Sequence, residues 1–370
     1  MKIDLSALKA LEDMEHVQEE SLIRAISFAL LDSYRELTKV EGRARVDIDR
    51  VDGTVRVLRA ETDDEGNLTG EFDDTPTDFG RDAARAVRDA IRGQVAAART
   101  ETSYGKYSAL EGSVVSGIVS RDARANERGL TVVHLGTEAD GHDGMILTAE
   151  HIPGEKLEHG DRVKCYVTAV HRGQRGIQIL LSRTHPELVR GLFALEVPEV
   201  ADGSVEITGI AREAGHRSKV SVQSTVNGLN AKGACIGPRG QRVTAIMDAL
   251  GGEKIDIVDF SEEPATYVGN ALAPAKVVRV DVTDRDMQVA RAVVPDHQLS
   301  LAIGREGQNA RLAARLTGWK IDIRPESGGD RRDRGVPGHA GGLSGPVGCE
   351  GLPGVTLVSG LKTGRHEEVR

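Results

Sequence analysis

The pattern of apolar and polar residues divides the first part of the chain into helical and extended segments. Apolar residues recur with the period of an amphipathic helix in 15–36 and again in 79–99. Between them the pattern alternates in 43–49 and 54–58, and the Asp-Gly pair that separates these runs is a strong β-hairpin signal. The acidic stretch 63–74 is predicted to be a loop. These elements predict one α+β module.

Short strands dominate the next part of the chain. Apolar runs rich in β-branched residues are separated by polar connectors that contain glycine. The predicted strands are 114–119, 130–135, 144–147, 163–170 and 177–182. Five short strands within about 75 residues favour a small closed barrel of the OB type, and periodicity alone fits an SH3-like barrel equally well.

The strongest feature of the sequence is an internal repeat. The heptapeptide CIGPRGQ at 235–241 matches AIGREGQ at 302–308. Each copy leads into a helical stretch that ends near a glycine, and then into the strand sequence KIDI. We take 219–222 and 277–282 as the strands that precede the two copies. Two copies of one supersecondary unit are hard to produce by chance.

Both copies carry the pattern G-x-x-G between two helices. Glycine lets a backbone approach a ligand closely, and loop amides next to a helix N-terminus form a donor cluster suited to phosphate. KH modules clamp about four nucleotides of a single strand in this way. A lone G-x-x-G is more often an ordinary turn, but its repetition with the same helix and strand favours a KH module. A Walker A loop is excluded, because neither Gly240 nor Gly307 precedes Lys-Ser or Lys-Thr.

The candidate RNA-binding residues belong to the two loops and to the helix starts behind them, where donors are expected to face the RNA backbone or base edges. They are Lys232, Gly237, Pro238, Arg239, Gly240, Gln241, Arg242, Gly304, Arg305, Glu306, Gly307, Gln308, Asn309 and Arg311. Lys232 is included because it lies just before the first loop and could reach a phosphate. Glu306 is expected to face solvent while backbone amides make the contact.

Composition argues against several other classes of protein. Of 370 residues only 3% are aromatic, which disfavours recognition that relies mainly on base stacking. The three cysteines form no C-x-x-C pair and the histidines form no H-E-x-x-H motif, so we expect no metal site. No acid–base pair is recognisable, so we expect no catalytic residues and no cofactor. The apolar runs are far shorter than a membrane span, and we expect a cytoplasmic monomer.

Negative charge is concentrated in the first module. The whole chain has a formal charge of −9, and residues 1–105 hold 15 Lys or Arg against 23 Asp or Glu, a net charge of −8. Residues 204–326 have 16 against 15, a net charge of +1. An acidic module repels nucleic acid and suits a basic protein surface, although a merely soluble surface would look the same.

These motifs together resemble the NusA family of bacterial transcription elongation, termination and antitermination factors. The resemblance rests on DFGR at 78–81, GACIG at 233–237, GGEKIDI at 251–257, NALAPA at 270–275, LAIGREGQNARLA at 301–313 and LTGW at 316–319. It covers about residues 1–326. The chain resembles the shorter, actinobacterial type, because no acidic repeats follow the second KH module.

The resemblance implies an α+β multidomain fold with a fixed order of parts. The expected parts are an N-terminal RNA polymerase-binding domain at 1–105, a five-stranded S1-like OB barrel at 108–184, and two tandem prokaryotic-type (type II) KH domains at 204–270 and 271–326. We expect the Gly- and Arg-rich remainder, 327–370, to be disordered. The short linker between the KH copies, 271–276, is expected to join them into a continuous platform.

The resemblance also implies a function. NusA-like proteins bind core RNA polymerase and nascent single-stranded RNA, act with other Nus factors, and modulate pausing, termination and antitermination. The alternatives are an RNA-processing enzyme, since polynucleotide phosphorylase also combines KH and S1 modules, and a ribosome-associated KH protein. In polynucleotide phosphorylase a large catalytic core comes first and one KH precedes the barrel, whereas residues 1–105 here are too short for that core.

Overall fold

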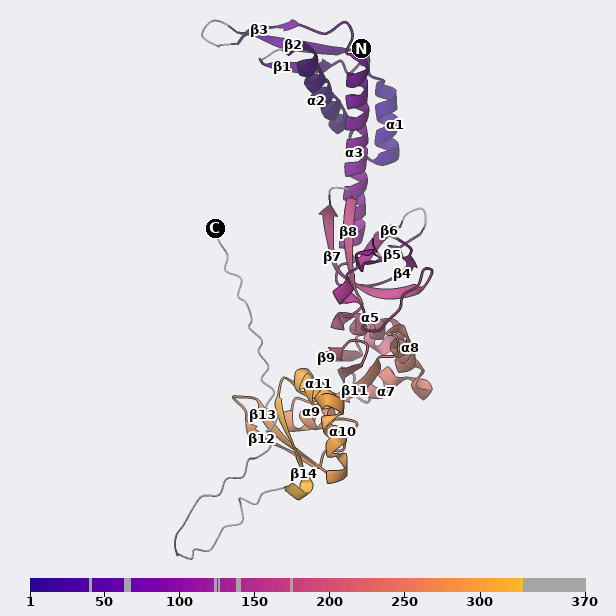
Figure 1. The fold of residues 1–370 in the computed structure, drawn as a ribbon, viewed down its shortest axis with the longest axis vertical. Helices are drawn as coiled ribbons and strands as arrows, with labels where there is room; N and C mark the ends of the chain where they lie inside the picture. Colours follow the sequence, from indigo (N-terminus) through magenta and orange to yellow (C-terminus); the bar gives the residue numbers. More distant parts are fainter. Residues whose placement is uncertain are drawn as a thin grey trace, which may run out of the picture. The chain divides into compact units, whose positions relative to one another are not determined.

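The structure is a computed structural model that describes residues 1–39, 42–62, 68–122, 125, 127–137, 141–173 and 176–328. Most of the tail predicted to be disordered, 329–370, lies outside the described residues. The chain divides into two compact units. The first contains Met1–Ala149 and Leu157–Ser182, and the second contains Glu150–Lys156 and the chain from Arg183 on (Figure 1).

The first unit begins with an α+β domain. Its elements are α1 (Leu5–Glu15), α2 (Glu19–Thr38), β1 (Ala44–Ile48), β2 (Val55–Thr62), β3 (Leu68–Asp73) and α3 (Gly80–Ser108). The three strands form an antiparallel sheet in the order β1-β2-β3, and α2 packs its buried residues against it. The buried side chains include Leu22, Ile26, Leu30 and Val57.

Three sequence predictions for this domain need correction. The helix predicted at 15–36 corresponds to α2, which begins at Glu19, and the sequence analysis missed α1, which ends where His16 adopts a left-handed conformation with φ 55°. The stretch 63–74, predicted to be a loop, contains β3, whose side chains are almost all exposed and therefore give no apolar signal. The helix predicted to end at 99 continues to Ser108, and its last turns pack Tyr104 and Tyr107 against the core of the following barrel.

The barrel prediction is confirmed. Its strands are β4 (Val114–Ser120), β5 (Thr131–Leu135), β6 (His142–Ile146), β7 (Arg162–Gly173) and β8 (Gly176–Ser182). They close in the order β4-β5-β6-β8-β7, with a parallel pair between β6 and β8, which is a Greek-key arrangement of the OB type. The alternating pattern was informative because one face of each strand fills the barrel core.

The second unit contains two copies of one fold. The first copy comprises α5 (Pro186–Glu196), α6 (Pro198–Ala201), β9 (Val205–Glu213), β10 (Arg217–Ser224), α7 (Ala231–Ile236), α8 (Gln241–Ala249) and β11 (Lys254–Asp259). The second comprises α9 (Pro264–Ala271), β12 (Arg279–Asp284), β13 (Val289–Val294), α10 (Leu299–Ile303), α11 (Gln308–Thr317) and β14 (Lys320–Pro325). Each sheet combines one antiparallel and one parallel pair of strands, in the orders β11-β10-β9 and β12-β13-β14.

The topology corrects one equivalence drawn from the sequence. The segments 219–222 and 277–282 were taken as matching strands, but β10 corresponds to β13, since each pairs in parallel with the last strand of its own copy. The strand β12 therefore corresponds to β9. The sequence analysis identified neither β9 nor β13 as a separate strand.

The two copies share a buried apolar cluster. Val258 of β11 in the first copy packs with Tyr267, Ala271 and Leu272 of the second. Within the second copy, the Tyr267 hydroxyl donates a hydrogen bond to the Leu316 carbonyl at 3.3 Å, which fixes this side chain in the cluster. The segment 271–276, expected to bridge the copies, lies instead inside the second copy between α9 and β12, and the chain passes from one copy to the next between β11 and α9. Ala271 and Leu272 are nevertheless part of the packed joint between the two copies.

Candidate nucleic-acid interface

The two G-x-x-G loops have the same backbone conformation although their two middle residues differ. The first glycines, Gly237 and Gly304, have φ/ψ of 74°/175° and 76°/171°. The third residues, Arg239 and Glu306, both adopt the left-handed region, at 53°/23° and 53°/26°. The last glycines agree equally well, at 75°/13° and 74°/12°. The repeat seen in the sequence is thus a repeat of loop geometry.

The glycines serve two different purposes in these loops. A Cβ atom on Gly237 would lie 2.6 Å from Arg242 Cγ, and one on Gly304 would lie 2.8 Å from the Asn309 backbone nitrogen. The first glycine of each loop is therefore required for packing. A Cβ on Gly240 or Gly307 would meet no atom within 4 Å. The last glycine leaves an open surface at the start of the following helix.

The middle residues of both loops project into solvent. The side chains of Arg305 and Glu306 are 94% and 83% exposed, and Pro238 and Arg239 are also exposed. Behind each loop a helix begins, α8 at Gln241 and α11 at Gln308. Backbone amides at a helix N-terminus favour an anionic group, so each loop offers donors and open space suited to a phosphate.

Asn309 requires a correction. We expected its donors to face RNA, but the side chain is 2% exposed. Its Nδ2 donates to the carbonyls of Leu272 and Ala302 at 3.0 Å each, and to that of Leu301 at 3.4 Å. The side chain is thus directed into the protein, where it ties α11 to α10 and to the end of α9.

Three other predicted donors are engaged within the protein. Arg242 Nη1 donates to Glu199 Oε2 and to the Ala234 carbonyl, both at 2.8 Å. Arg311 binds Glu213 through Nε at 2.6 Å and Nη2 at 3.1 Å, and Gln308 Nε2 donates to the same carboxylate at 3.0 Å.

Two further predicted residues lie at the first loop. Lys232 is half-buried, with its Nζ 3.9 Å from Asp259 Oδ2. Gln241 is exposed. The structure therefore brings loop residues and helix starts together as predicted, but it turns Arg242, Gln308, Asn309 and Arg311 toward protein partners.

The sequence analysis missed two kinds of residue at this site. Glu199 and Glu213 hold the arginines behind the loops, and no short-range pattern points to them because their partners lie far away in the sequence. Leu301 and Ile303 are 46% and 39% exposed immediately before the second loop. Two apolar residues at alternate positions of a short helix cannot both be buried on one helix face, and this pattern could have indicated exposed apolar side chains next to the loop.

The charge state of Cys235, just before the first loop, follows from burial. Burial raises the pKa of the Cys235 thiol to about 11, so the group stays neutral near pH 7. Within the described parts of the chain, no group of three or more His, Cys, Asp or Glu residues is placed to hold a metal ion. No helix in those parts is long and apolar enough to cross a membrane.

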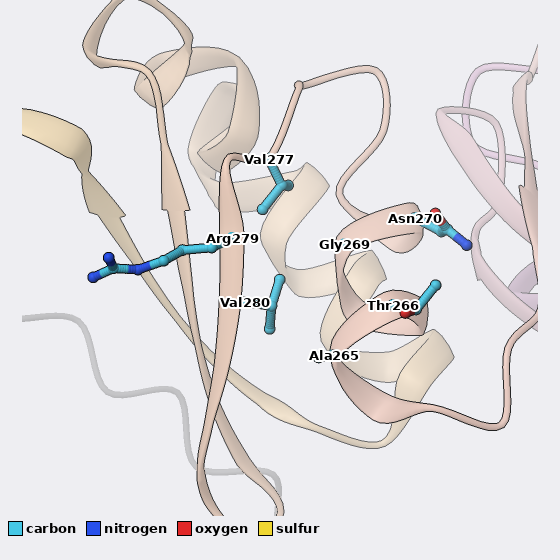
Figure 2. A pocket seen from close by; sticks show the side chains of 7 residues that line it. All are labelled: Ala265, Thr266, Gly269, Asn270, Val277, Arg279 and Val280. Carbon is cyan, nitrogen blue, oxygen red and sulfur yellow. The ribbon is translucent and has the colours of Figure 1, made fainter.

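A shallow cavity of about 380 Å³ lies between α9 and β12 in the second copy (Figure 2). It is lined by Ala265, Thr266, Gly269, Asn270, Val277, Arg279 and Val280. Arg279 extends to the other side of β12, where its Nε donates to Asp281 Oδ2 at 3.1 Å. None of the lining residues belongs to either G-x-x-G loop.

The barrel, the paired copies and their matching loops define a multidomain protein with tandem KH RNA-binding domains. Residues 183–260 match the model of the NusA-like first KH domain, and residues 264–330 match that of the NusA-like second KH domain. The chain belongs to the NusA family of transcription termination/antitermination proteins. Each KH match begins before the expected boundary, 204 or 271, because it includes the helices that precede the first strand.

The relatives match nearly the whole chain. The transcription termination/antitermination protein NusA of Mycobacterium tuberculosis strain H37Rv is 55% identical over 344 residues, which cover 93% of this chain and 99% of the relative. The protein of the same name from Bacillus subtilis strain 168 is 39% identical over 355 residues, covering 90% and 92%. The similarity therefore extends well beyond the KH domains.

Proposed function

We propose that this NusA-family protein binds core RNA polymerase through its N-terminal domain and holds nascent single-stranded RNA on its barrel and KH domains. Acting with other Nus factors and without catalysing a reaction, it modulates pausing, termination and antitermination. The observation that carries this proposal is the pair of loops at 237–240 and 304–307, which share one conformation and leave the last glycine open. Two equivalent clamps on one chain suit a single strand that passes from one KH domain to the next.

The N-terminal domain supports the polymerase part of the proposal. Its net charge of −8 disfavours RNA and suits a basic protein surface. Phe28 is 63% exposed and lines a cavity of about 280 Å³ between α2 and β1. An exposed aromatic side chain beside a cavity is typical of a protein-binding surface.

The experiment measures binding of the full chain to core RNA polymerase. Deleting residues 1–105 would cut α3 and remove Tyr104 from the barrel core, so a point variant is the better probe. We expect Phe28→Asp to weaken polymerase binding and to leave RNA binding unchanged. The matched control is Val226→Asp, which also places a carboxylate at an exposed apolar position but in the first KH domain.

Two outcomes would contradict the proposal. If the unmodified chain does not bind core polymerase but co-sediments with ribosomal subunits, the protein is a ribosome-associated KH protein. Phosphate-dependent release of nucleoside diphosphates from RNA would instead identify an RNA-processing enzyme.

A further inference from the structure

An arginine stands behind each RNA loop and connects the loop region to an acidic residue of another element. In the first KH domain, Arg242 donates through Nη1 to the Ala234 carbonyl and to Glu199, both at 2.8 Å. In the second, Arg311 donates through Nη1 to the carbonyl of Glu306 at 3.3 Å and through Nε to Glu213 at 2.6 Å. Both arginines are less than one-third exposed.

The acidic partners differ in their origin. Glu199 lies on α6, within the same KH domain as the loop that it supports. Glu213 is the last residue of β9 in the first KH domain, yet it binds side chains of α11 in the second. Besides Arg311 it accepts a hydrogen bond from Gln308 at 3.0 Å, and Arg315 Nη1 lies 3.7 Å away. The second loop is therefore supported across the domain boundary.

The residue that Arg311 holds is the one in the least favourable backbone conformation. Glu306 has φ 53°, and this left-handed region is energetically unfavourable for any residue with a Cβ atom. Arg311 hydrogen-bonds the carbonyl of this residue while Glu213 fixes the guanidinium from the other side. A loop held in this way presents its amides to phosphate without first having to be ordered.

We propose that Glu213 is a positioning residue of the second RNA clamp. This residue of the first KH domain orients Arg311, and Arg311 holds the loop of the second KH domain in its conformation. This inference rests on the proposed RNA-binding function. It gives Glu199 a corresponding role at the first clamp, where Arg242 bonds the Ala234 carbonyl just before the loop and packs against Gly237. It also makes the second clamp dependent on the joint between the domains.

The test is RNA affinity, measured by fluorescence anisotropy with a labelled single-stranded RNA on the full chain. Glu213→Gln and the matched control Glu199→Gln are each placed in two backgrounds. One background disables the first clamp with Pro238→Asp and Arg239→Asp, and the other disables the second with Arg305→Asp and Glu306→Asp. With the first clamp disabled, we expect Glu213→Gln to weaken RNA binding by about threefold, the scale of a partly exposed ion pair.

With the second clamp disabled, Glu213→Gln should have no effect, because the loop that it positions no longer contributes. Glu199→Gln should weaken RNA binding when the second clamp is disabled and have no effect when the first clamp is disabled. A merely structural role would weaken binding equally in both backgrounds, and that result would overturn the inference. Tighter binding would also overturn it, since Glu213 would then compete with RNA for Arg311.

Hydrogen exchange provides a readout that needs no RNA. Glu213→Gln should speed amide exchange in 304–308 and leave 237–241 unchanged, whereas unchanged exchange at both loops would overturn the inference. Arg311→Lys serves as a second variant if Glu213→Gln fails to fold, because it keeps the charge but cannot bridge two acceptors as a guanidinium does.

If the unmodified chain binds no RNA, the proposed function fails and the inference falls with it. If RNA binding depends on the second clamp but not on Glu213, only the inference fails.

Discussion

Lys219, a fully buried residue of the first KH domain, donates from Nζ to the carbonyl of Ala273 at 2.7 Å, between α9 and β12 of the second KH domain. The same ammonium lies 3.1 Å from Asp256 Oδ2. Burial lowers the pKa of Lys219, and the neighbouring Asp256 carboxylate opposes that shift. A buried polar contact thus joins the two domains in addition to their shared apolar cluster.

Replacing this lysine should destabilise the domain pair. We expect Lys219→Met to lower the free energy of unfolding by about 2–4 kcal/mol, because it removes one partner of a buried ionic contact and leaves the Ala273 carbonyl without its donor. Denaturant unfolding followed by circular dichroism measures this change. The control Lys320→Met alters an exposed lysine and should change stability by less than about 0.5 kcal/mol. Equal effects of the two variants would show that the buried contact contributes nothing specific.

The stability of the domain pair should depend on the Glu213 carboxylate at acid pH. Its hydrogen bond with Arg311, more than any other contact, holds the pKa of Glu213 below the ordinary value of 4.5. A depressed pKa means that the contribution is complete above about pH 4.5 and is lost as the pH falls through the folded-state value. Glu213→Gln should therefore lower stability at pH 7 and reduce the fall in stability as the pH drops below about 4.5.

Urea unfolding at several pH values measures the effect. The exposed Glu262 provides the control, since Glu262→Gln should leave the stability at pH 7 within about 0.5 kcal/mol of the parent value. An acid-induced loss of stability that is identical in the parent and in Glu213→Gln would contradict this prediction.

Asn309 should be important for stability rather than for direct RNA contact. Asn309→Ala removes the donor shared by the carbonyls of Leu272, Leu301 and Ala302, so we expect a loss of about 2 kcal/mol in the free energy of unfolding. Gln308→Ala, one residue earlier and less buried, should cost less than about 1 kcal/mol. If thermal unfolding shows the two variants to be equally stable, the structural role of Asn309 is wrong.

The two glycines of the second loop should respond differently to substitution by alanine. Gly304→Ala places a Cβ 2.8 Å from the Asn309 nitrogen, whereas Gly307→Ala places one in open space. Gly307→Ala costs roughly 1 kcal/mol from the left-handed backbone. Gly304→Ala costs about 1–3 kcal/mol, because φ 76° with ψ 171° is a conformation that essentially only glycine adopts, and it adds the steric clash. Gly304→Ala should therefore destabilise the protein more, while Gly307→Ala should mainly weaken RNA binding. Unfolding and RNA titrations on both variants distinguish these effects, and the reverse pattern would contradict the assignment of the open surface.

The sequence was most informative where a feature is local. The glycine spacing of 237–240 and 304–307 specified the loops because left-handed backbone and close approach require glycine at fixed positions. The barrel strands were predictable because each has one buried face. In contrast, β3 is exposed on both faces, so no periodic pattern marks it.

Long-range partners could not be predicted from spacing. Arg311 and Glu213 are 98 residues apart, and Arg242 and Glu199 are 43 apart. A sequence shows that an arginine follows a loop but not whether RNA or a carboxylate occupies its donors. For the same reason Asn309 appeared to be a surface donor until the packing of α11 placed it in the interior.

The central claim is that both G-x-x-G loops clamp single-stranded RNA, and the most direct test is an RNA titration at several salt concentrations. Each loop is changed by one double substitution that leaves carboxylates at both exposed middle positions. In the first loop it is Pro238→Asp with Arg239→Asp, and in the second it is Arg305→Asp with Glu306→Asp. Asparagine at the same positions is the matched control, because Asp and Asn both tolerate the left-handed region. We expect each Asp pair to weaken binding by about tenfold, and each lost phosphate contact to reduce the slope of log K against log salt by about 0.7. Titrations and slopes that are unchanged in both Asp variants would contradict the account.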